Sequence, residues 1–223
     1  MNTRITFTTI ALMIIFLSCT SPTEKANSGE DGSPFSMSND QEHIFPSSSG
    51  MVSFVHDGTM KGTEVWYWSD WGKNQRKETN IVVEMMGFKQ EQKKTSIIIG
   101  ENIYNLNEDQ KTATKISSDF VGELSNVKYD DEDFLKEMGG KKIGAETILG
   151  KECDIWEIES MMGKVSVWKG LALHTVVDVM GMKSEITADK IDINFKTSDS
   201  MFDISQYEIK DMGNVEDYMP GRN

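Results

Sequence analysis

The sequence predicts a mainly β fold with minor α, in which a curved antiparallel sheet, an unclosed β-barrel, wraps one or two short helices. After Gly50, short apolar stretches with two-residue alternation follow one another and are separated by turns rich in glycine and asparagine. Only one clear helical pattern interrupts them, and strands do not alternate with helices as in a parallel α/β fold. The 223 residues suffice for one such domain.

The first strands follow in close succession. The segment 63–71 carries apolar residues on both faces, and the segment 76–86 alternates between an apolar and a polar face. Three further strands of about six or seven residues, with short turns between them, form an antiparallel meander. The full set of predicted strands in this half is 51–57, 63–71, 76–86, 95–100, 102–107 and 111–117.

One helix is predicted within the segment 129–140. Asp130 or Asp131 can cap its first turn, and Leu135 and Met138 lie within one apolar stripe. Gly139 suits its C-terminal end. The strand pattern then resumes at 152–160, 164–170, 171–180, 183–194 and 200–209, which gives about ten strands in total.

The charge of the chain limits its partners. It has 36 acidic and 23 basic residues, and a net charge of −13. A surface of this sign is repelled by phosphate backbones, so we expect no nucleic-acid partner.

The N-terminus has the pattern of an export signal. Arg4 is followed by an apolar run from Ile5 to Leu17 without any charge, which is too short for the roughly 20 residues of a spanning helix. The run ends in Phe16-Leu17-Ser18 before Cys19, which resembles the lipobox of bacterial lipoproteins. The resemblance implies a signal peptide over residues 1–18 and lipidation, palmitate included, at Cys19.

An ordinary secretory signal with a chance cysteine is the alternative. The other cysteine, Cys153, lies in a predicted strand, so a disulfide would have to tie the N-terminal tail to the core. Lipidation explains Cys19 better, and two or three acyl chains anchor a protein firmly in a membrane. Thr20 is not the aspartate that resembles an inner-membrane retention signal, so we expect an outer-membrane lipoprotein whose domain faces the periplasm or the outside.

The segment after Cys19 is rich in Ser, Gly, Asn and Pro and lacks apolar periodicity. Such a composition buries too little surface to offset the entropy of ordering, so residues 19–49 are expected to form a flexible tether. The β domain is expected over residues 50–212, with a flexible tail at 213–223.

The order of motifs resembles lipoprotein-carrier-like (LolA- and LolB-like) domains, which include the periplasmic lipoprotein carrier and its outer-membrane receptor. The resemblance covers roughly residues 50–210. It rests on the segments YWSDWGKNQRKE, IIIGENIYNLNEDQKTATKI, AETILGKECDIWEI, VSVWKGLALHTVV and SMFDISQYEI. It implies a strongly curved sheet whose concave side forms an apolar cavity, and this chain would carry its own lipid anchor, as the receptor does.

Two functions follow from this reading. The first is a non-enzymatic envelope lipoprotein that binds an apolar ligand, such as lipid or lipoprotein acyl chains, in the concave face. The second is a structural or protein-interaction lipoprotein whose cavity is filled by its own side chains. The sequence does not indicate which residues would contact a ligand.

Residues with catalytic or metal-binding chemistry are sparse. His43, His56 and His174 lack a two-histidine metal spacing, so structural or surface roles are expected for them. Cys153 fits a buried small hydrophobe better than a nucleophile. With no phosphate loop, nucleophile elbow or zinc signature, we expect no catalytic residue, no metal site and no cofactor.

Methionine and tryptophan allow alternatives. The 15 methionines, with pairs at Met161-Met162 and Met180/Met182, could hold copper(I) through thioethers, but a pliable apolar surface is the plainer interpretation. Among the five tryptophans we expect only Trp71 to be exposed, which leaves glycan stacking as a weaker alternative to core packing.

Overall fold

The computed structural model describes residues 44–85, 88–117, 132–179 and 181–214. They lie within one compact unit, Ser38–Asn223. The strands are β1 (Gly50–Gly58), β2 (Met60–Ser69), β3 (Asn74–Met85), β4 (Phe88–Ile99), β5 (Asn102–Asn107), β6 (Thr112–Ser117), β7 (Gly140–Ile148), β8 (Lys151–Ile158), β9 (Gly163–Trp168), β10 (Leu171–Val179), β11 (Met182–Asp192) and β12 (Glu208–Asn214). The helices are α2 (Glu132–Glu137) and the 3-10 turns η1 (Asp70–Gly72), η2 (Glu159–Met161) and η3 (Asp199–Phe202).

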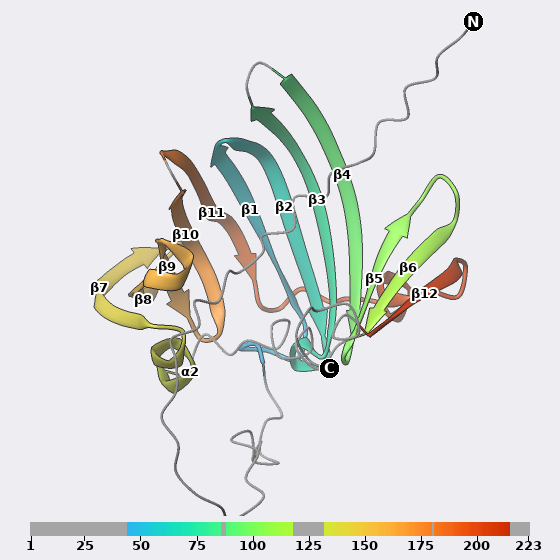
Figure 1. The fold of residues 1–223 in the computed structure, drawn as a ribbon. Helices are drawn as coiled ribbons and strands as arrows, with labels where there is room; N and C mark the ends of the chain where they lie inside the picture. The colour runs from blue at the N-terminus through green and yellow to red at the C-terminus, as the bar shows by residue number, and fades with distance from the viewer. Residues whose placement is uncertain (1–43, 86–87, 118–131, 180, 215–223) are drawn as a thin grey trace, which may run out of the picture. The chain divides into compact units, whose positions relative to one another are not determined.

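All twelve strands belong to one sheet, in the order β12-β6-β5-β4-β3-β2-β1-β11-β10-β9-β8-β7. Figure 1 shows two meanders, β1–β6 and β7–β11, which join where β1 pairs with β11. Because β12 and β7 occupy opposite edges, the sheet is not closed. The predicted mainly β class with an unclosed, curved sheet is confirmed.

One pairing and one strand boundary depart from the expected pattern. The ladder between β12 and β6 is parallel, whereas the other ladders are antiparallel. The segment 200–209 was expected to be one strand, but it contains the end of η3 and a turn before β12 begins at Glu208. The Asp203 carboxylate accepts a hydrogen bond from the Ser205 backbone N–H at 2.8 Å, which bends the chain into an Asx-type turn.

The core has two apolar clusters. The larger one includes the fully buried Trp68 and Cys153. In the smaller one, Leu135 of α2 packs among Trp156, Ile158, Val165 and Val167. The predicted helix is therefore confirmed between residues 132 and 137, where one apolar side chain fixes it, while Asp130 and Asp131 lie outside the described residues.

The folded part starts before Gly50, contrary to the predicted tether boundary. Ile44 and Phe45 are buried in the larger cluster, and their backbone N–H groups both donate to the Trp71 carbonyl. The Phe45 and Trp68 rings lie 5.1 Å apart. The sequence hides this contact because two apolar residues within a polar stretch show no periodicity.

The segment after β11 covers one face of β2 and β3. Tyr67 lies 5.6 Å from the Phe195 ring, and Arg76 donates to the Met201 carbonyl at 3.1 Å. Tyr67 and Arg76 are paired across the ladder and therefore share a face. Trp66 and Lys77, their neighbours along β2 and β3, point to the other side.

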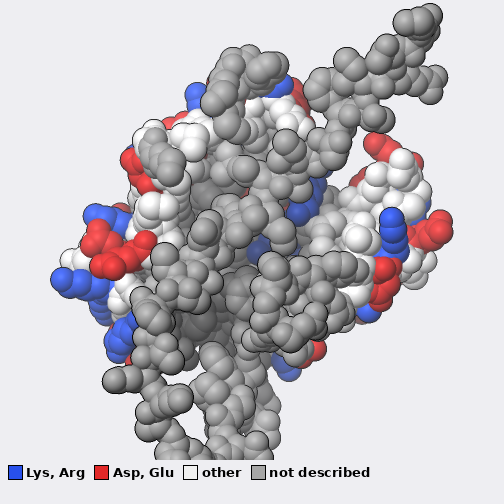
Figure 2. Space-filling view, in the orientation of Figure 1, with Lys and Arg blue, Asp and Glu red and all other residues white. Residues whose placement is uncertain are grey.

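The surface mixes charges of both signs. In Figure 2, acidic and basic side chains lie beside one another on the described surface. One example is Lys142, whose Nζ lies 2.7 Å from Asp154 and 3.7 Å from Glu132. The net negative charge is therefore not gathered into one acidic patch on the described part of this view.

Candidate ligand-binding face

The face opposite Tyr67 carries aromatic and charged side chains in register, and we call it the Trp66 face. Directly paired residues of a ladder point to the same side of a sheet. Phe54 pairs with both Glu64 and Ala188, and Trp66 pairs with both Val52 and Lys77. By this pairing the Trp66 face comprises Val52, Phe54 and His56 of β1; Glu64, Trp66 and Trp68 of β2; Lys77 and Thr79 of β3; and Ser184, Ile186 and Ala188 of β11.

The apolar part of the Trp66 face is centred on two rings. The Phe54 and Trp66 centroids are 5.3 Å apart with tilted planes, a favourable geometry for aromatic pairs. Phe54 is only 3% exposed, while Trp66 is half-buried. Of these two rings, Trp66 therefore provides the more accessible part of this apolar surface.

A carboxylate organises the polar part of the same face. Glu64 accepts a hydrogen bond from the Trp66 indole N–H through Oε1, and one from the Thr79 hydroxyl at 3.0 Å through Oε2. These contacts fix both carboxylate oxygens between β2 and β3. The indole ring in turn receives the Lys77 ammonium, which lies 3.9 Å from the ring centroid.

Burial changes the electrostatics of this cluster. Desolvation lowers the pKa of Lys77, although the Glu64 carboxylate opposes that shift. Desolvation also lowers the pKa of His56, again against the influence of Glu64, whose Oε2 lies 3.9 Å from Nε2. His56 is therefore a neutral imidazole near pH 7.

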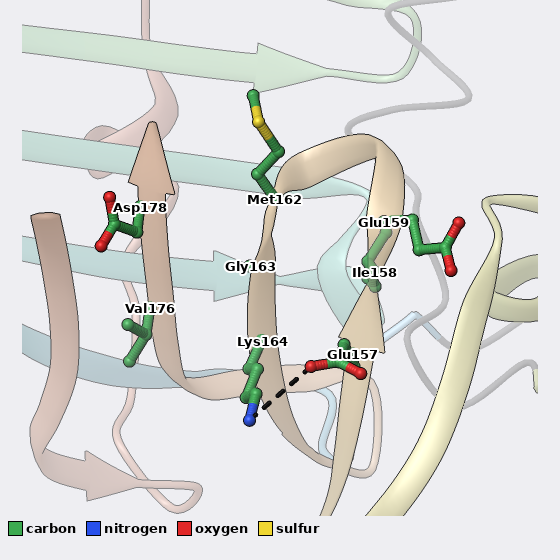
Figure 3. A pocket seen from close by; sticks show the side chains of 8 residues that line it. All are labelled: Glu157, Ile158, Glu159, Met162, Gly163, Lys164, Val176 and Asp178. Atoms are coloured by element: carbon green, nitrogen blue, oxygen red, sulfur yellow. Dashed lines mark ion pairs between the residues drawn. The ribbon is translucent and has the colours of Figure 1, made fainter. Parts of the chain in front are cut away.

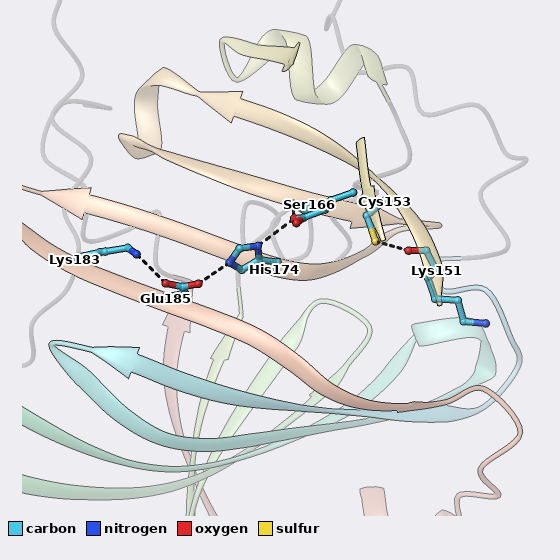
Figure 4. Close-up of polar contacts among 7 residues, drawn as sticks. Lys151, Cys153, Ser166, His174, Lys183 and Glu185 are labelled. Atoms are coloured by element: carbon cyan, nitrogen blue, oxygen red, sulfur yellow. Dashed lines mark hydrogen bonds and ion pairs between the residues drawn. The ribbon is translucent and has the colours of Figure 1, made fainter. Parts of the chain in front are cut away.

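A second polar cluster lies outside the Trp66 face. Its side chains come from four strands, β7, β9, β10 and β11. His174 Nδ1 lies 3.1 Å from Glu146, and Nε2 lies 3.0 Å from Glu185. Ser166 donates to Glu146, and Lys183 donates to Glu185 at 2.9 Å (Figure 4). Because the Ser166 hydroxyl donates to Glu146 and not to His174, the arrangement lacks the contact that activates a serine nucleophile.

Cys153 lies beside this cluster as a buried thiol. It is 0% exposed, and its Sγ donates to the Lys151 carbonyl at 3.5 Å (Figure 4). Burial raises the pKa of the Cys153 thiol, which disfavours the reactive thiolate. The prediction that Cys153 serves as a small core residue is confirmed.

The methionine pair is divided between two environments. Met161 packs against the α2 cluster, whereas Met162 is 56% exposed and lines a shallow depression of about 340 Å³ (Figure 3). An ion pair between Glu157 and Lys164 lies at the same depression, at 3.7 Å. This division fits apolar filling better than a thioether metal site. Met180 lies outside the described residues.

Several other predicted residues can now be placed. Trp71, expected to be exposed, is half-buried, because η1 is held against residues 44–48 by backbone hydrogen bonds. Among the described residues, no group of three or more His, Cys, Asp or Glu side chains could hold a metal ion. No helix in the same part of the chain is both long and apolar enough to cross a bilayer. Cys19 and His43 lie outside the described residues.

The Trp66 face was missed at the level of the sequence. Its members come from four strands, and β1 and β11 are more than 120 residues apart. The sequence shows the adjacent aromatic residues Trp66, Tyr67 and Trp68, but the pairing of Trp66 with Lys77 depends on the register of the β2–β3 ladder. Only the alternation Glu64-Trp66-Trp68 indicated that these three side chains share a side.

The fold and the face define a domain with one open, mainly antiparallel sheet and one amphipathic side. Residues 55–202 match the family described as "Domain of unknown function (DUF4412)". The match covers more than half of the chain, so this protein belongs to that family. No curated protein matches the chain.

Solved structures provide a comparison at the level of the fold. An uncharacterized conserved protein from Thermus thermophilus is 7% identical, covers 74% of this chain and 91% of its own, and has a TM-score of 0.50. LprF from Mycobacterium bovis is 10% identical, with 67% and 86% covered and a TM-score of 0.36. A LolA-superfamily protein from Nitrosomonas europaea is 11% identical, with 74% and 93% covered and a TM-score of 0.30. The likeness to the Thermus protein supports a shared fold and nothing further.

Proposed function

We propose that this protein is a lipid-anchored binding module of the bacterial envelope, which takes up an apolar or amphipathic ligand, such as an acyl chain, on the Trp66 face. The observation that carries this proposal is the pairing of an aromatic surface, Phe54 and Trp66, with a half-buried ammonium, Lys77, on the same side of the sheet. A core that served packing alone would not place a desolvated cation there, because burying charge costs free energy.

The anchor is the second part of the proposal. The uncharged run that ends at Leu17 and the cysteine at position 19 support export and lipidation. Thr20 after the cysteine, in place of an aspartate, supports placement in the outer membrane. Labelling cells with radioactive palmitate tests the anchor: we expect label in the full-length protein and none in Cys19→Ala. A labelled and membrane-bound Cys19→Ala protein would contradict it.

Ligand binding can be tested on residues 38–223, which form a compact unit. We expect this protein to enhance the fluorescence of N-phenyl-1-naphthylamine and to lose the signal when an acyl ligand displaces the probe. Trp66→Ala should weaken probe binding, while Tyr67→Ala, an aromatic residue on the opposite face of β2, serves as the matched control. The absence of probe binding and of co-purified lipid would refute the proposal.

One observation favours the structural alternative, in which the chain fills its own cavity. Phe54 and His56 are already 3% and 6% exposed, so part of the face is covered within the chain itself. If the face is filled, the purified protein should bind no probe and Trp66→Ala should reduce stability alone. The fluorescence experiment therefore separates the two functions.

A further inference from the structure

Three polar side-chain atoms in the described part of the chain are shielded from solvent without a hydrogen-bond partner. They are both ring nitrogens of His56 and the hydroxyl of Ser184. A buried polar group without a partner destabilises a folded chain, so such groups are rare outside functional sites. Their presence requires an explanation.

The three atoms belong to one neighbourhood. His56 of β1 pairs with Ile186, and Ser184 lies two residues further along β11, so the two are diagonal neighbours on the Trp66 face. Glycines stand opposite both: Gly62 pairs with His56 on β2, and Gly58 pairs with Ser184 on β1. Neither glycine has a side chain that could satisfy the unpaired atoms.

The hydrogen-bonding capacity of the pair indicates the chemistry of its partner. A neutral imidazole has one donor and one acceptor nitrogen, and a serine hydroxyl can both donate and accept. The carboxylate of Glu64 is 3.9 Å from Nε2, which favours the proton on that nitrogen and leaves Nδ1 as the acceptor. The complementary group must therefore donate to Nδ1 and also accept from, or donate to, Ser184 Oγ. A hydroxyl does both.

The charge beside the pair discriminates against anions. The Glu64 carboxylate lies 3.9 Å from Nε2 of His56, and its negative charge repels a carboxylate or a phosphate. Lys77 interacts with the same carboxylate and is directed over the Trp66 ring. An uncharged head is thus favoured at His56, with the aromatic surface of Phe54 and Trp66 two to four residues along the strands for an attached chain.

We propose that His56 and Ser184 form the head-group end of the ligand site, and that the ligand is an amphiphile with an uncharged, hydroxyl-bearing head, of the acylglycerol or long-chain alcohol class. This inference rests on the proposed binding function of the Trp66 face. It adds that the Trp66 face recognises the head group of its ligand by hydrogen bonding, in addition to binding an apolar chain.

The test compares three ligands with the same acyl chain on residues 38–223. Displacement of N-phenyl-1-naphthylamine is measured with 1-oleoylglycerol, methyl oleate and oleate. We expect 1-oleoylglycerol to bind at least about fivefold more tightly than methyl oleate, which corresponds to one hydrogen bond of ordinary strength. Oleate should bind more weakly than 1-oleoylglycerol, and Glu64→Gln should narrow that difference.

Variants of His56 and Ser184 test whether these two residues recognise the head group. Ser184→Ala should remove most of the preference for 1-oleoylglycerol, leave the affinity for methyl oleate unchanged and not lower the melting temperature, because it removes an unsatisfied hydroxyl. His56→Phe should have the same effect on preference. Ser160→Ala, an exposed serine that donates to the Met138 carbonyl outside the Trp66 face, is the matched control.

The outcomes separate the inference from the function on which it rests. Equal binding of the three ligands, tighter binding of oleate, or an unchanged preference in Ser184→Ala would overturn the head-group site while leaving an acyl-binding face. Failure of all three ligands and of the fluorescent probe would refute the binding function itself.

Discussion

The Nε2 atom of His174 lies 3.0 Å from Oε1 of Glu185, across the ladder between β10 and β11. Its Nδ1 atom is within hydrogen-bond distance of Glu146 on β7, so one imidazole ring links two carboxylates on opposite sides. The ring therefore connects the edge strand β7 to the interior strand β11 of the sheet.

We expect stability to fall in acid through these two carboxylates. The Lys183 ammonium and then His174 lower the pKa of Glu185, and hydrogen bonds from Ser166 and then His174 lower the pKa of Glu146. With folded values below the ordinary 4.5, the unfolded chain binds protons first as pH falls. The free energy of unfolding should thus decrease from about pH 5 downward, by about 0.5–1 kcal/mol in all once solvent screening is allowed for.

Urea unfolding at pH 3.5 and at pH 6.5 measures this loss. Glu185→Gln should reduce the difference in the free energy of unfolding between pH 3.5 and pH 6.5. Glu208→Gln, an exposed glutamate on the distant strand β12, is the control and should leave the difference unchanged. An equal pH dependence in wild type and Glu185→Gln would show that the linked carboxylates do not contribute.

Trp68 should be the most sensitive core position of β2. Its side chain is 0% exposed, contacts the Phe45 ring and donates its indole N–H to the Ser47 carbonyl at 3.0 Å. Trp68→Ala is expected to lower the free energy of unfolding by about 3–5 kcal/mol. Leu149→Ala, at an exposed turn position, should change it by less than about 0.5 kcal/mol. Similar losses in both variants would contradict the packing described for Trp68.

Gly62 should not tolerate a side chain. Its φ is +149°, and a Cβ atom there would lie 2.1 Å from the Asn80 carbonyl oxygen of the paired strand. Backbone cannot move aside cheaply, so Gly62→Ala should destabilise the protein by about 1–3 kcal/mol. Gly100→Asn is the control, since φ is +57° and nothing lies within 4 Å of a Cβ at that turn. Thermal unfolding of both variants tests the contrast, and a stable Gly62→Ala protein would argue against the close approach of β2 and β3.

Cys153 should be unreactive in the folded protein. Residues 38–223 contain no other cysteine, so Ellman's reagent reports on Cys153 alone. Because the thiol is buried and its pKa is raised, we expect labelling at the rate of unfolding in native buffer and rapid labelling in 6 M guanidinium as an operational control. Fast labelling of the native protein would place the thiol at the surface.

Much of the sheet could be predicted because its strands alternate. Val52, Phe54 and His56 of β1 already show the two-residue period. The first half of β4, residues 88–94, gave no such signal, since its described side chains are polar and exposed and it pairs with β3 through the backbone. The edge strand β7 was also not recognised as a separate strand, because glycines, lysines and a bulge at Ile143 break its pattern.

The candidate site was harder to predict from the sequence than the fold. Neither His56 nor Ser184 belongs to a recognisable binding or catalytic motif in the sequence. Their relation depends on the register of β1 against β11, including an irregularity between Ser53 and Phe54 that shifts the pairing. A one-residue change in that register would turn Ser184 to the opposite side, so only the three-dimensional ladder reveals the pair.

The β1–β11 ladder also has a kinetic consequence. Each half of the sheet consists of strands that pair with their neighbours in sequence, so each half can begin to form from local contacts. The two halves pair where β1 meets β11, through residues such as Ser53 and Asp189, which are 136 positions apart and share a hydrogen bond. Closing so long a loop is slow, and parallel pairing of β12 with β6 follows later still in the chain. Folding should therefore be limited by the docking of the two halves, and the Trp66 face, which includes residues of both β1 and β11, is complete only after that docking.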